Sequence, residues 1–151
     1  MSGLAAIRSS GIQEQKSTGR YPVKTVGFEI ASQLRATTDL TLTASLGYND
    51  GKYTSFPGAT CFTGQTLAQG CIRTGTEQGQ NLTGHQLPYN PKWAGAVGFS
   101  YDTGITDSLK LGVDGSAAYS GAYWANTTES PLARQDDFWR ITAGIRVHER
   151  G

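Results

Sequence analysis

Two cysteines are the residues of this sequence best suited to covalent chemistry. Cys61 and Cys71 lie in a segment rich in Gly, Thr and Gln. An even pair in a secreted or surface protein indicates a disulfide, which stabilises a loop of this size by about 3 kcal/mol in the chain-entropy model. A metal site and a pair of free buried thiols are the alternatives. Only His85 and His148 are available as further soft ligands, and their spacing is poor for zinc, so we expect a disulfide and no metal.

The other titratable residues form no catalytic constellation. His85 lies in an expected loop and His148 at a strand end, where a lone histidine is more often a surface residue than a ligand. The adjacent Asp136 and Asp137 could bind a cation or act as an acid–base pair, although two carboxylates at a loop exit are more often solvated. The sequence contains no Ser-His-Asp arrangement, phosphate-binding glycine loop or metal-ligand cluster. We therefore expect neither an enzyme nor a cofactor.

The composition excludes several other classes of protein. The 151 residues are 37% hydrophobic and 17% charged, with 20 glycines and a formal net charge of +1. This balance excludes disorder driven by charge and argues against a basic nucleic-acid-binding protein. No apolar run reaches the roughly 18 residues that a transmembrane helix needs. The length predicts one domain, and a mean hydropathy of −0.38 would by itself indicate a soluble protein.

Alternation of apolar and polar residues predicts long strands, because successive side chains of a strand point to opposite faces. The alternating segments are residues 26–36, 40–49, 93–101, 109–120 and 139–147, with a weaker one at residues 3–9. Soluble strands usually have about five or six residues, whereas a membrane strand needs about nine to eleven. We therefore expect an all-β fold: an antiparallel, up-and-down transmembrane β-barrel segment of five to six long strands, with almost no helix.

The expected connections alternate in length. Residues 37–39 and 103–108 have the composition of tight turns, whereas residues 51–92 and 121–138 are long. Outer-membrane barrels alternate short periplasmic turns with long extracellular loops in this way. An aromatic girdle is then expected at the outer ends of the apolar face: Tyr48, Trp93, Tyr119 and Trp139. Tyr101 falls at the periplasmic end. The alternative is an ordinary antiparallel sheet with one face in a core.

Three segments resemble the barrel of TonB-dependent receptors. Residues 23–30 contain a Gly-x-Glu strand motif, residues 40–58 follow it after a short turn, and residues 81–93 contain Leu-x-Gly, Leu-Pro and Pro-Lys-Trp. The likeness covers about residues 23–147, but the plug domain, the TonB box, the earlier strands and the final strand are lacking. The resemblance is to the late, C-terminal part of a barrel of roughly 22 strands. We therefore expect residues 1–151 to be a partial barrel domain with cut ends, and an open curved sheet when alone.

This resemblance implies a function in energy-coupled uptake of a scarce ligand, such as a ferric siderophore, cobalamin or a glycan. It places the chain in the outer membrane of a Gram-negative bacterium. The implied partners are outer-membrane lipid, the plug and the rest of the barrel, the inner-membrane TonB complex acting through the plug, and the ligand. The alternatives are a small complete porin-like or adhesin-like barrel and a secreted soluble β-sheet binding module. A requirement for detergent or lipid separates the barrels from the soluble module.

Two sets of residues are the candidate site. Charged residues of the polar face are expected to line the lumen: Glu29, Arg35, Lys110, Asp114, Arg140 and Arg146. Aromatic residues of the long loops are expected to contact the ligand: Tyr53, Phe56, Phe62, Tyr89, Tyr123 and Trp124. The alternative for the charged set is hydration and pairing across strands. The alternative for the aromatic set is that these rings pack the loops together.

Overall fold

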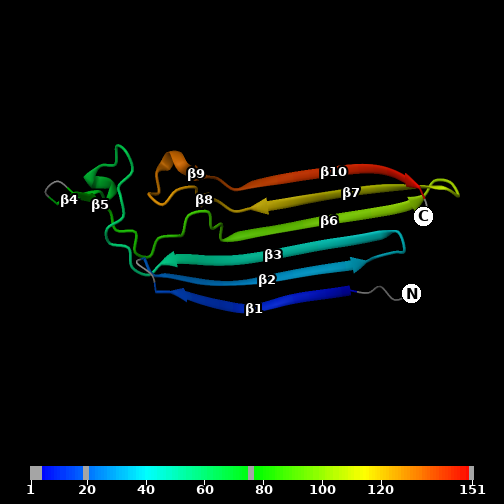
Figure 1. Ribbon diagram of the computed structural model, residues 1–151, viewed down its shortest axis with the longest axis horizontal. Helices are drawn as coiled ribbons and strands as arrows, with labels where there is room; N and C mark the ends of the chain where they lie inside the picture. The colour runs from blue at the N-terminus through cyan, green and yellow to red at the C-terminus, as the bar shows by residue number, and fades with distance from the viewer. Residues whose placement is uncertain (1–4, 19–20, 75–76, 150–151) are drawn as a thin grey trace.

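Six long strands form one antiparallel sheet, in which each strand lies beside its neighbours in the chain (Figure 1). The computed structural model describes residues 5–18, 21–74 and 77–149. The sheet, in spatial order, consists of β1 (Ala5–Ser17), β2 (Val23–Arg35), β3 (Leu40–Tyr53), β6 (Trp93–Gly104), β7 (Leu109–Ser120) and β10 (Phe138–Glu149). The all-β fold and the up-and-down order are confirmed, and the sheet is not closed.

Most strands run longer than the alternation predicts, whereas β7 has the predicted bounds of residues 109–120. Pairing between β2 and β3 continues to Val23 and Tyr53, well past the predicted limits at residues 26 and 49. Residues 5–9 of the predicted strand at residues 3–9 belong to β1, which extends to Ser17, and residues 3 and 4 lie outside the described residues. The alternation stops earlier than the strands do because charged residues replace apolar ones where the hairpins continue.

The two short connections use the same turn chemistry. In the turn between β2 and β3, the Thr37 hydroxyl accepts hydrogen bonds from the amides of Asp39 (3.2 Å) and Leu40 (3.0 Å). In the turn between β6 and β7, the Thr106 hydroxyl accepts one from the Leu109 amide (3.1 Å). A threonine hydroxyl in these positions replaces a backbone acceptor and closes the turn. Both turns lie at one end of the sheet, which we name the turn end (Figure 1).

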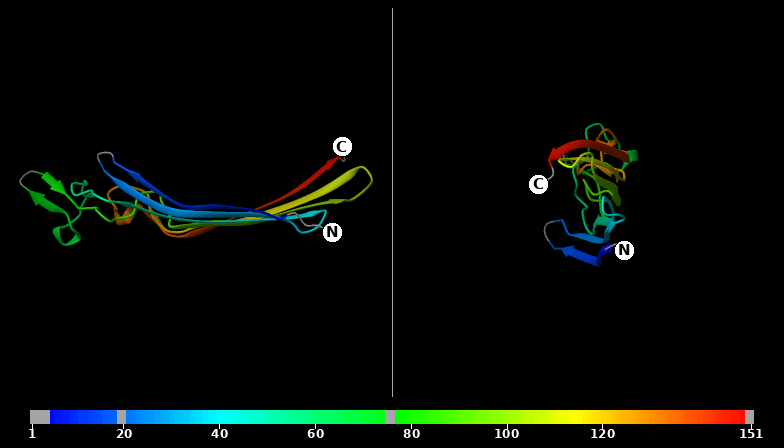
Figure 2. Two further views of the ribbon diagram at one scale, coloured as in Figure 1. Left: turned by 90° about the horizontal axis from the view of Figure 1, so that it is seen from below. Right: turned by 90° about the vertical axis from the view of Figure 1, so that its right-hand side faces the viewer.

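The two long connections project from the opposite end, which we name the loop end (Figures 1 and 2). The first, between β3 and β6, contains a 3-10 turn, η1 (Leu67–Gln69), and the short pair β4 (Ile72–Thr74) and β5 (Glu77–Gly79). The second, between β7 and β10, contains η2 (Pro131–Ala133) and the pair β8 (Tyr123–Trp124) and β9 (Arg134–Gln135). No helix in the described part of the chain is long and apolar enough to cross a membrane.

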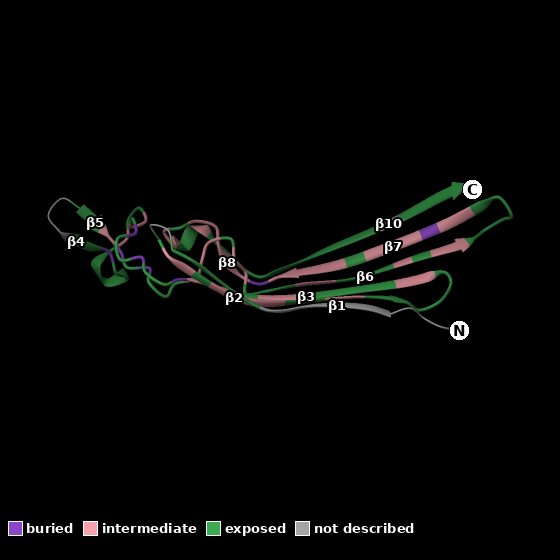
Figure 3. Ribbon diagram, turned by 60° about the horizontal axis from the view of Figure 1, so that its bottom comes forward, coloured by how far each residue is buried: buried purple, intermediate pink, exposed green. Residues whose placement is uncertain are grey.

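The register gives the sheet two unlike faces, because residues paired across strands share a face. The apolar face contains the rows Ile30–Leu46 and Val97–Ala117–Ile141. It is open to solvent: Val97 is 56% exposed and Ile141 is 79% exposed. The polar face carries the intervening Ser, Thr, Gly and charged residues. Exposed and half-buried residues make up almost all of β2, β3, β6, β7 and β10 in Figure 3, so these five strands cover no hydrophobic core among the residues whose burial is described.

A row of aromatic rings separates the apolar part of this face from a charged part nearer the loop end. Tyr48 packs against Trp93, with ring centroids 4.7 Å apart, and Tyr119 packs against Trp139 at 5.2 Å. Beyond this aromatic row, toward the loop end, the same face becomes charged. There the Lys52 ammonium lies 2.9 Å from the Asp50 carboxylate. The apolar face is therefore a band with a defined edge.

Candidate functional site

The two long loops dock on each other to form a single unit at the loop end. The Tyr89 amide donates a hydrogen bond to the Trp124 carbonyl (2.8 Å), and His85 Nδ1 lies 2.8 Å from a carboxylate oxygen of Glu129. At the base of the loops, the Gly121 amide donates to the Trp93 carbonyl (2.8 Å). Contacts between segments this far apart in the chain hold both loops over one end of the sheet.

The buried core of the described residues lies in this loop unit. It consists of Tyr53, Phe56, Ala59 and Leu82, with Val23 and Leu87 packed against it. Tyr53 and Phe56 are each 8% exposed, and their rings lie 4.9 Å apart between centroids. The sequence predicts a ligand-contacting role for both rings, but their burial leaves little surface for a ligand. For these two rings the structure agrees with the alternative of loop packing.

Burial and neighbouring charges shift the pKa values of two residues at the loop end, Tyr53 and Asp50. Tyr53 lies beyond the aromatic row and outside the apolar band, and burial, with a smaller contribution from the Glu129 charge, raises its pKa. Asp50, also beyond the row, accepts a hydrogen bond from the Lys52 ammonium, which lowers the pKa of Asp50. The Lys92 ammonium lies 3.6 Å from the other carboxylate oxygen. These charges hold the end of the first loop, at Lys92, against the end of β3.

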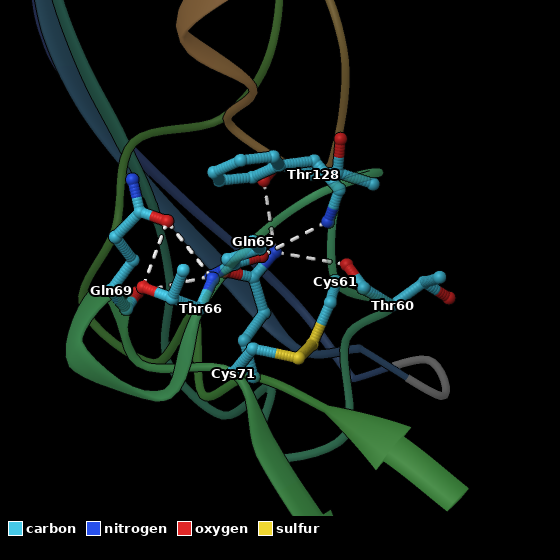
Figure 4. Close-up of a disulfide and its surroundings, with 9 residues drawn as sticks. Thr60, Cys61, Gln65, Thr66, Gln69, Cys71 and Thr128 are labelled. Carbon is cyan, nitrogen blue, oxygen red and sulfur yellow. Dashed lines mark hydrogen bonds between the residues drawn. A yellow bond between two sulfur atoms is a disulfide. The ribbon is translucent and has the colours of Figure 1, made fainter.

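The predicted disulfide is present and braces the tip of the first loop. Cys61 and Cys71 are bonded, with their Cα atoms 5.7 Å apart (Figure 4). Within the ring that they close, the Gln65 side chain accepts a hydrogen bond from the Phe62 amide (2.9 Å) and donates one to the Gln69 carbonyl (3.0 Å). The disulfide and one glutamine side chain therefore replace a hydrophobic core in this segment.

Gln80 joins the disulfide ring to the second loop. Its side chain is 7% exposed. Its amide nitrogen donates to the carbonyls of Thr60 and Thr128, each at 2.9 Å, and its oxygen accepts from Gln65 (2.9 Å). Every polar atom of this buried amide is satisfied, as a buried polar group requires. No local sequence signal predicts this role, because its partners lie 15 to 48 residues away.

Two of the predicted loop aromatics, Tyr89 and Tyr123, pair outside the loop core, and a third, Trp124, contacts an arginine. The ring centroids of Tyr89 and Tyr123 are 6.2 Å apart, and the Arg134 guanidinium lies 5.7 Å from the ring centroid of Trp124. Tyr89 is 70% exposed. Phe62 lies apart from this group, in the disulfide ring. Tyr89, Tyr123 and Trp124 stay predicted ligand contacts: the Tyr89 and Tyr123 rings form a pair, and the Trp124 ring lies beside Arg134.

The register places all six charged residues predicted to line a lumen on the polar face: Glu29, Arg35, Lys110, Asp114, Arg140 and Arg146. Arg146 binds Asp114 (2.8 Å) and Asp102 (3.1 Å). The alternation in the sequence does not predict a polar-face position for Asp102, because the predicted strand ends at residue 101. Arg35 and Lys110 line a hollow of about 530 Å³ at the turn end, together with Arg146.

A glycine makes the ion pair between β10 and β6 possible. Arg146 reaches Asp102 across β7, directly over Gly112, its paired residue. A Cβ atom at this glycine would lie 2.5 Å from Arg146 Nε and 2.7 Å from an Asp102 oxygen. The missing side chain therefore leaves the path along which the arginine crosses the strand. In the described part of the chain, no group of three or more His, Cys, Asp and Glu residues could hold a metal ion.

The fold and the site together define a class: an open antiparallel sheet with one exposed apolar face, one charged polar face, and two docked loops at one end. Comparisons with protein-family models, with curated proteins and with solved structures found no match for this chain. A functional assignment therefore rests on this geometry and on the sequence motifs.

Proposed function

We propose that the chain forms part of the barrel wall of an outer-membrane, TonB-dependent receptor that takes up a scarce ligand such as a ferric siderophore. One observation carries the proposal above all others: the apolar face of the sheet is exposed and ends at an aromatic row, beyond which charges begin. Lipid on that face explains both the exposure and the edge, because membrane barrels carry an apolar band between girdles of aromatic residues.

The dimensions of the band support this location. On β3 it runs from Leu40 to Tyr48, which is roughly 26 Å along a strand at about 3.3 Å per residue. At the tilt of about 40° that is common in membrane barrels, this corresponds to about 20 Å across the bilayer, close to the usual band of about 25 Å. An exposed apolar surface of this extent on a soluble protein would require a partner.

The edges of the sheet support a larger barrel. Among the described residues, β1 and β10 each pair on one side only. A membrane offers no water to unpaired backbone groups, so a spanning sheet must be closed. Six strands that remain open therefore favour a wall completed by further strands over a small barrel formed by this chain alone. We propose accordingly that the plug and the other strands belong to the intact receptor, together with its coupling to the inner-membrane TonB complex.

The loop unit supports a receptor role. It is braced by a disulfide, a buried amide and a small aromatic core, and it presents the exposed Tyr89 ring beside Tyr123. Rigid loops with exposed aromatic rings suit ligand capture, since little conformational freedom is lost on binding. In the proposed receptor, the loops face outward, and ligand passes from them along the polar face.

The membrane part of the proposal is tested by refolding the chain from urea into phosphatidylcholine vesicles and, in parallel, into buffer. We expect β-structure and protection of the six strands from protease only with lipid. Cooperative folding in buffer without lipid would contradict a membrane location and favour the soluble binding module.

The receptor part is tested by the DNA that flanks the coding sequence. A plug-encoding region upstream and further barrel strands downstream are expected. An intact coding region with neither would contradict the receptor assignment, even if the chain inserts into lipid.

A further inference from the structure

A hollow of about 730 Å³ opens on the polar face at the loop end. Its floor is made of small residues, among them Gly47, Ala94 and Ala118. A Cβ atom at Gly47 would meet nothing closer than a backbone oxygen at 3.8 Å. The space above this glycine is therefore open, and a side chain at this position would have room.

Amide side chains stand around this floor. Gln13 and Gln15 of β1 line the hollow beside Asn49 of β3, and Gln13 and Asn49 lie in one transverse row of the sheet, on either side of Gly27. Both glutamines are exposed, and within the described part of the chain their side-chain amides have no hydrogen-bond partner. The Asn49 amide donates to the Asn90 side-chain oxygen (2.6 Å). The hollow is therefore rich in groups that both donate and accept hydrogen bonds.

The hollow carries little charge. Among its described lining residues, Glu29 is the one charged side chain, and no lysine or arginine is present. Three cationic residues of the polar face, Arg35, Lys110 and Arg146, line the separate hollow at the turn end. Arg140 pairs with Ala118 at the side of the floor but does not line the hollow. A strongly anionic ligand would find no counter-charge beside the amides.

Tyr89 adds an aromatic surface to the hollow. Tyr89 is 70% exposed, although it belongs to a docked loop, and it lines the hollow. Its backbone has a positive φ of 55°, which is uncommon for a bulky residue. The hydrogen bond from its amide to the Trp124 carbonyl holds this conformation, as does the contact between the Gln86 amide and the Asn90 carbonyl. The loop therefore fixes the ring at the hollow instead of burying it.

We propose that this hollow binds a neutral carbohydrate. Hydroxyl groups donate and accept hydrogen bonds, as do the side-chain amides of Gln13, Gln15 and Asn49. An aromatic ring packs on the apolar C–H face of a sugar while its hydroxyl group stays in water. The inference rests on the proposed function, which makes the polar face the wall of a wet lumen, and it changes the expected ligand from a ferric siderophore to a glycan.

The test measures ligand binding to the chain reconstituted in phosphatidylcholine vesicles. The probes are maltotriose, cellotriose and triacetylchitotriose, with the anionic ferric tris-catecholate complex as the comparison. Protease protection on the same samples reports insertion separately. We expect saturable binding of at least one trisaccharide by isothermal titration calorimetry, and none of the catecholate complex in this hollow.

Variants assign the binding to the hollow. Tyr89→Ala is expected to weaken trisaccharide binding about ten-fold through loss of the ring contact, and Gln13→Leu about three- to ten-fold through loss of hydrogen bonds. Gly47→Leu fills the hollow without a backbone clash and should abolish binding. Thr142→Leu, on the same face but outside the hollow, is the matched control and should leave the affinity unchanged.

The outcomes separate the two proposals. A chain that fails to insert contradicts the proposed function and the inference with it. A chain that inserts but binds no trisaccharide contradicts the carbohydrate assignment alone. The carbohydrate assignment alone is also contradicted if Gly47→Leu and Thr142→Leu weaken trisaccharide binding equally. It is contradicted as well if the catecholate complex binds and Gly47→Leu abolishes that binding.

Discussion

A charge placed on the apolar face should destabilise the chain far more in lipid than the same charge on the polar face. Val97 is the position of choice, since it lies on β6 midway between Trp93 and Tyr101, the two aromatic limits of the band. It is 56% exposed. The perturbation is Val97→Arg, and the control is Ser116→Arg, an exposed residue of the polar face on the adjacent strand.

The magnitude follows from the depth of the position. Val97 is four residues from either limit, or roughly 13 Å along the strand, which corresponds to the middle of the bilayer if the band spans it. Arginine at the midplane of a membrane barrel costs about 2–4 kcal/mol, and the cost falls toward zero near the interfaces. In water, a substitution at a half-exposed strand position changes stability by no more than about 1 kcal/mol. The two environments therefore predict different results for the same variant.

The assay is urea titration of the chain in phosphatidylcholine vesicles, followed by circular dichroism. We expect Val97→Arg to lower the free energy of unfolding by about 2–4 kcal/mol and Ser116→Arg to lower it by less than about 1 kcal/mol. Equal effects of the two variants would refute the assignment of the faces. A small effect of both would show that neither face meets lipid.

Three further predictions concern the loop end. The double variant Cys61→Ser/Cys71→Ser should destabilise the first loop by about 3 kcal/mol, seen as faster proteolysis of that loop with unchanged β-signal; loss of the β-signal would show that the sheet depends on the disulfide. Gln80→Leu should cost about 1–3 kcal/mol, because three partly buried hydrogen bonds are lost, and amide hydrogen exchange of both loops should accelerate together; faster exchange in the first loop alone would show that the loops are not coupled through this side chain. The pKa of Asp50 is lowered by Lys52, so its stabilising contribution is present above the ordinary pKa of an aspartate and is lost as the pH falls through the lowered value. Asp50→Asn should remove this acid-dependent loss from the unfolding profile, and an unchanged profile would contradict the assignment.

The regular part of the fold is predictable from the sequence, because a strand in a two-faced sheet repeats every two residues. The rows that contain Leu46 and Val97 follow directly from that alternation. The Thr-containing turns also follow from local chemistry, as does the pairing of Cys61 with Cys71 in a Gly-rich loop. Each of these features depends on a few neighbouring residues and on no long-range contact.

The loop unit is not predictable in this way. Burial of Tyr53 and Phe56 depends on Leu82, which belongs to a distant part of the loop, and Gln80 finds Thr128 in a different loop altogether. An aromatic residue in a loop has the same local sequence signature whether it packs a small core or stands exposed like Tyr89. Only the tertiary contacts of the folded loop separate these cases, and these contacts join residues far apart in the chain that no short sequence pattern connects.

The most direct test of the central claim is a scan of single labels along β3 in bilayers. Cysteine introduced at Thr43, Ala44, Ser45 or Leu46, with the native disulfide kept oxidised, is labelled with an environment-sensitive dye and exposed to brominated phospholipid. Positions 44 and 46 belong to the apolar face and positions 43 and 45 to the polar face. We predict strong quenching at 44 and 46 and weak quenching at 43 and 45. Quenching that does not alternate, or that is absent at all four positions, would contradict a membrane-facing sheet.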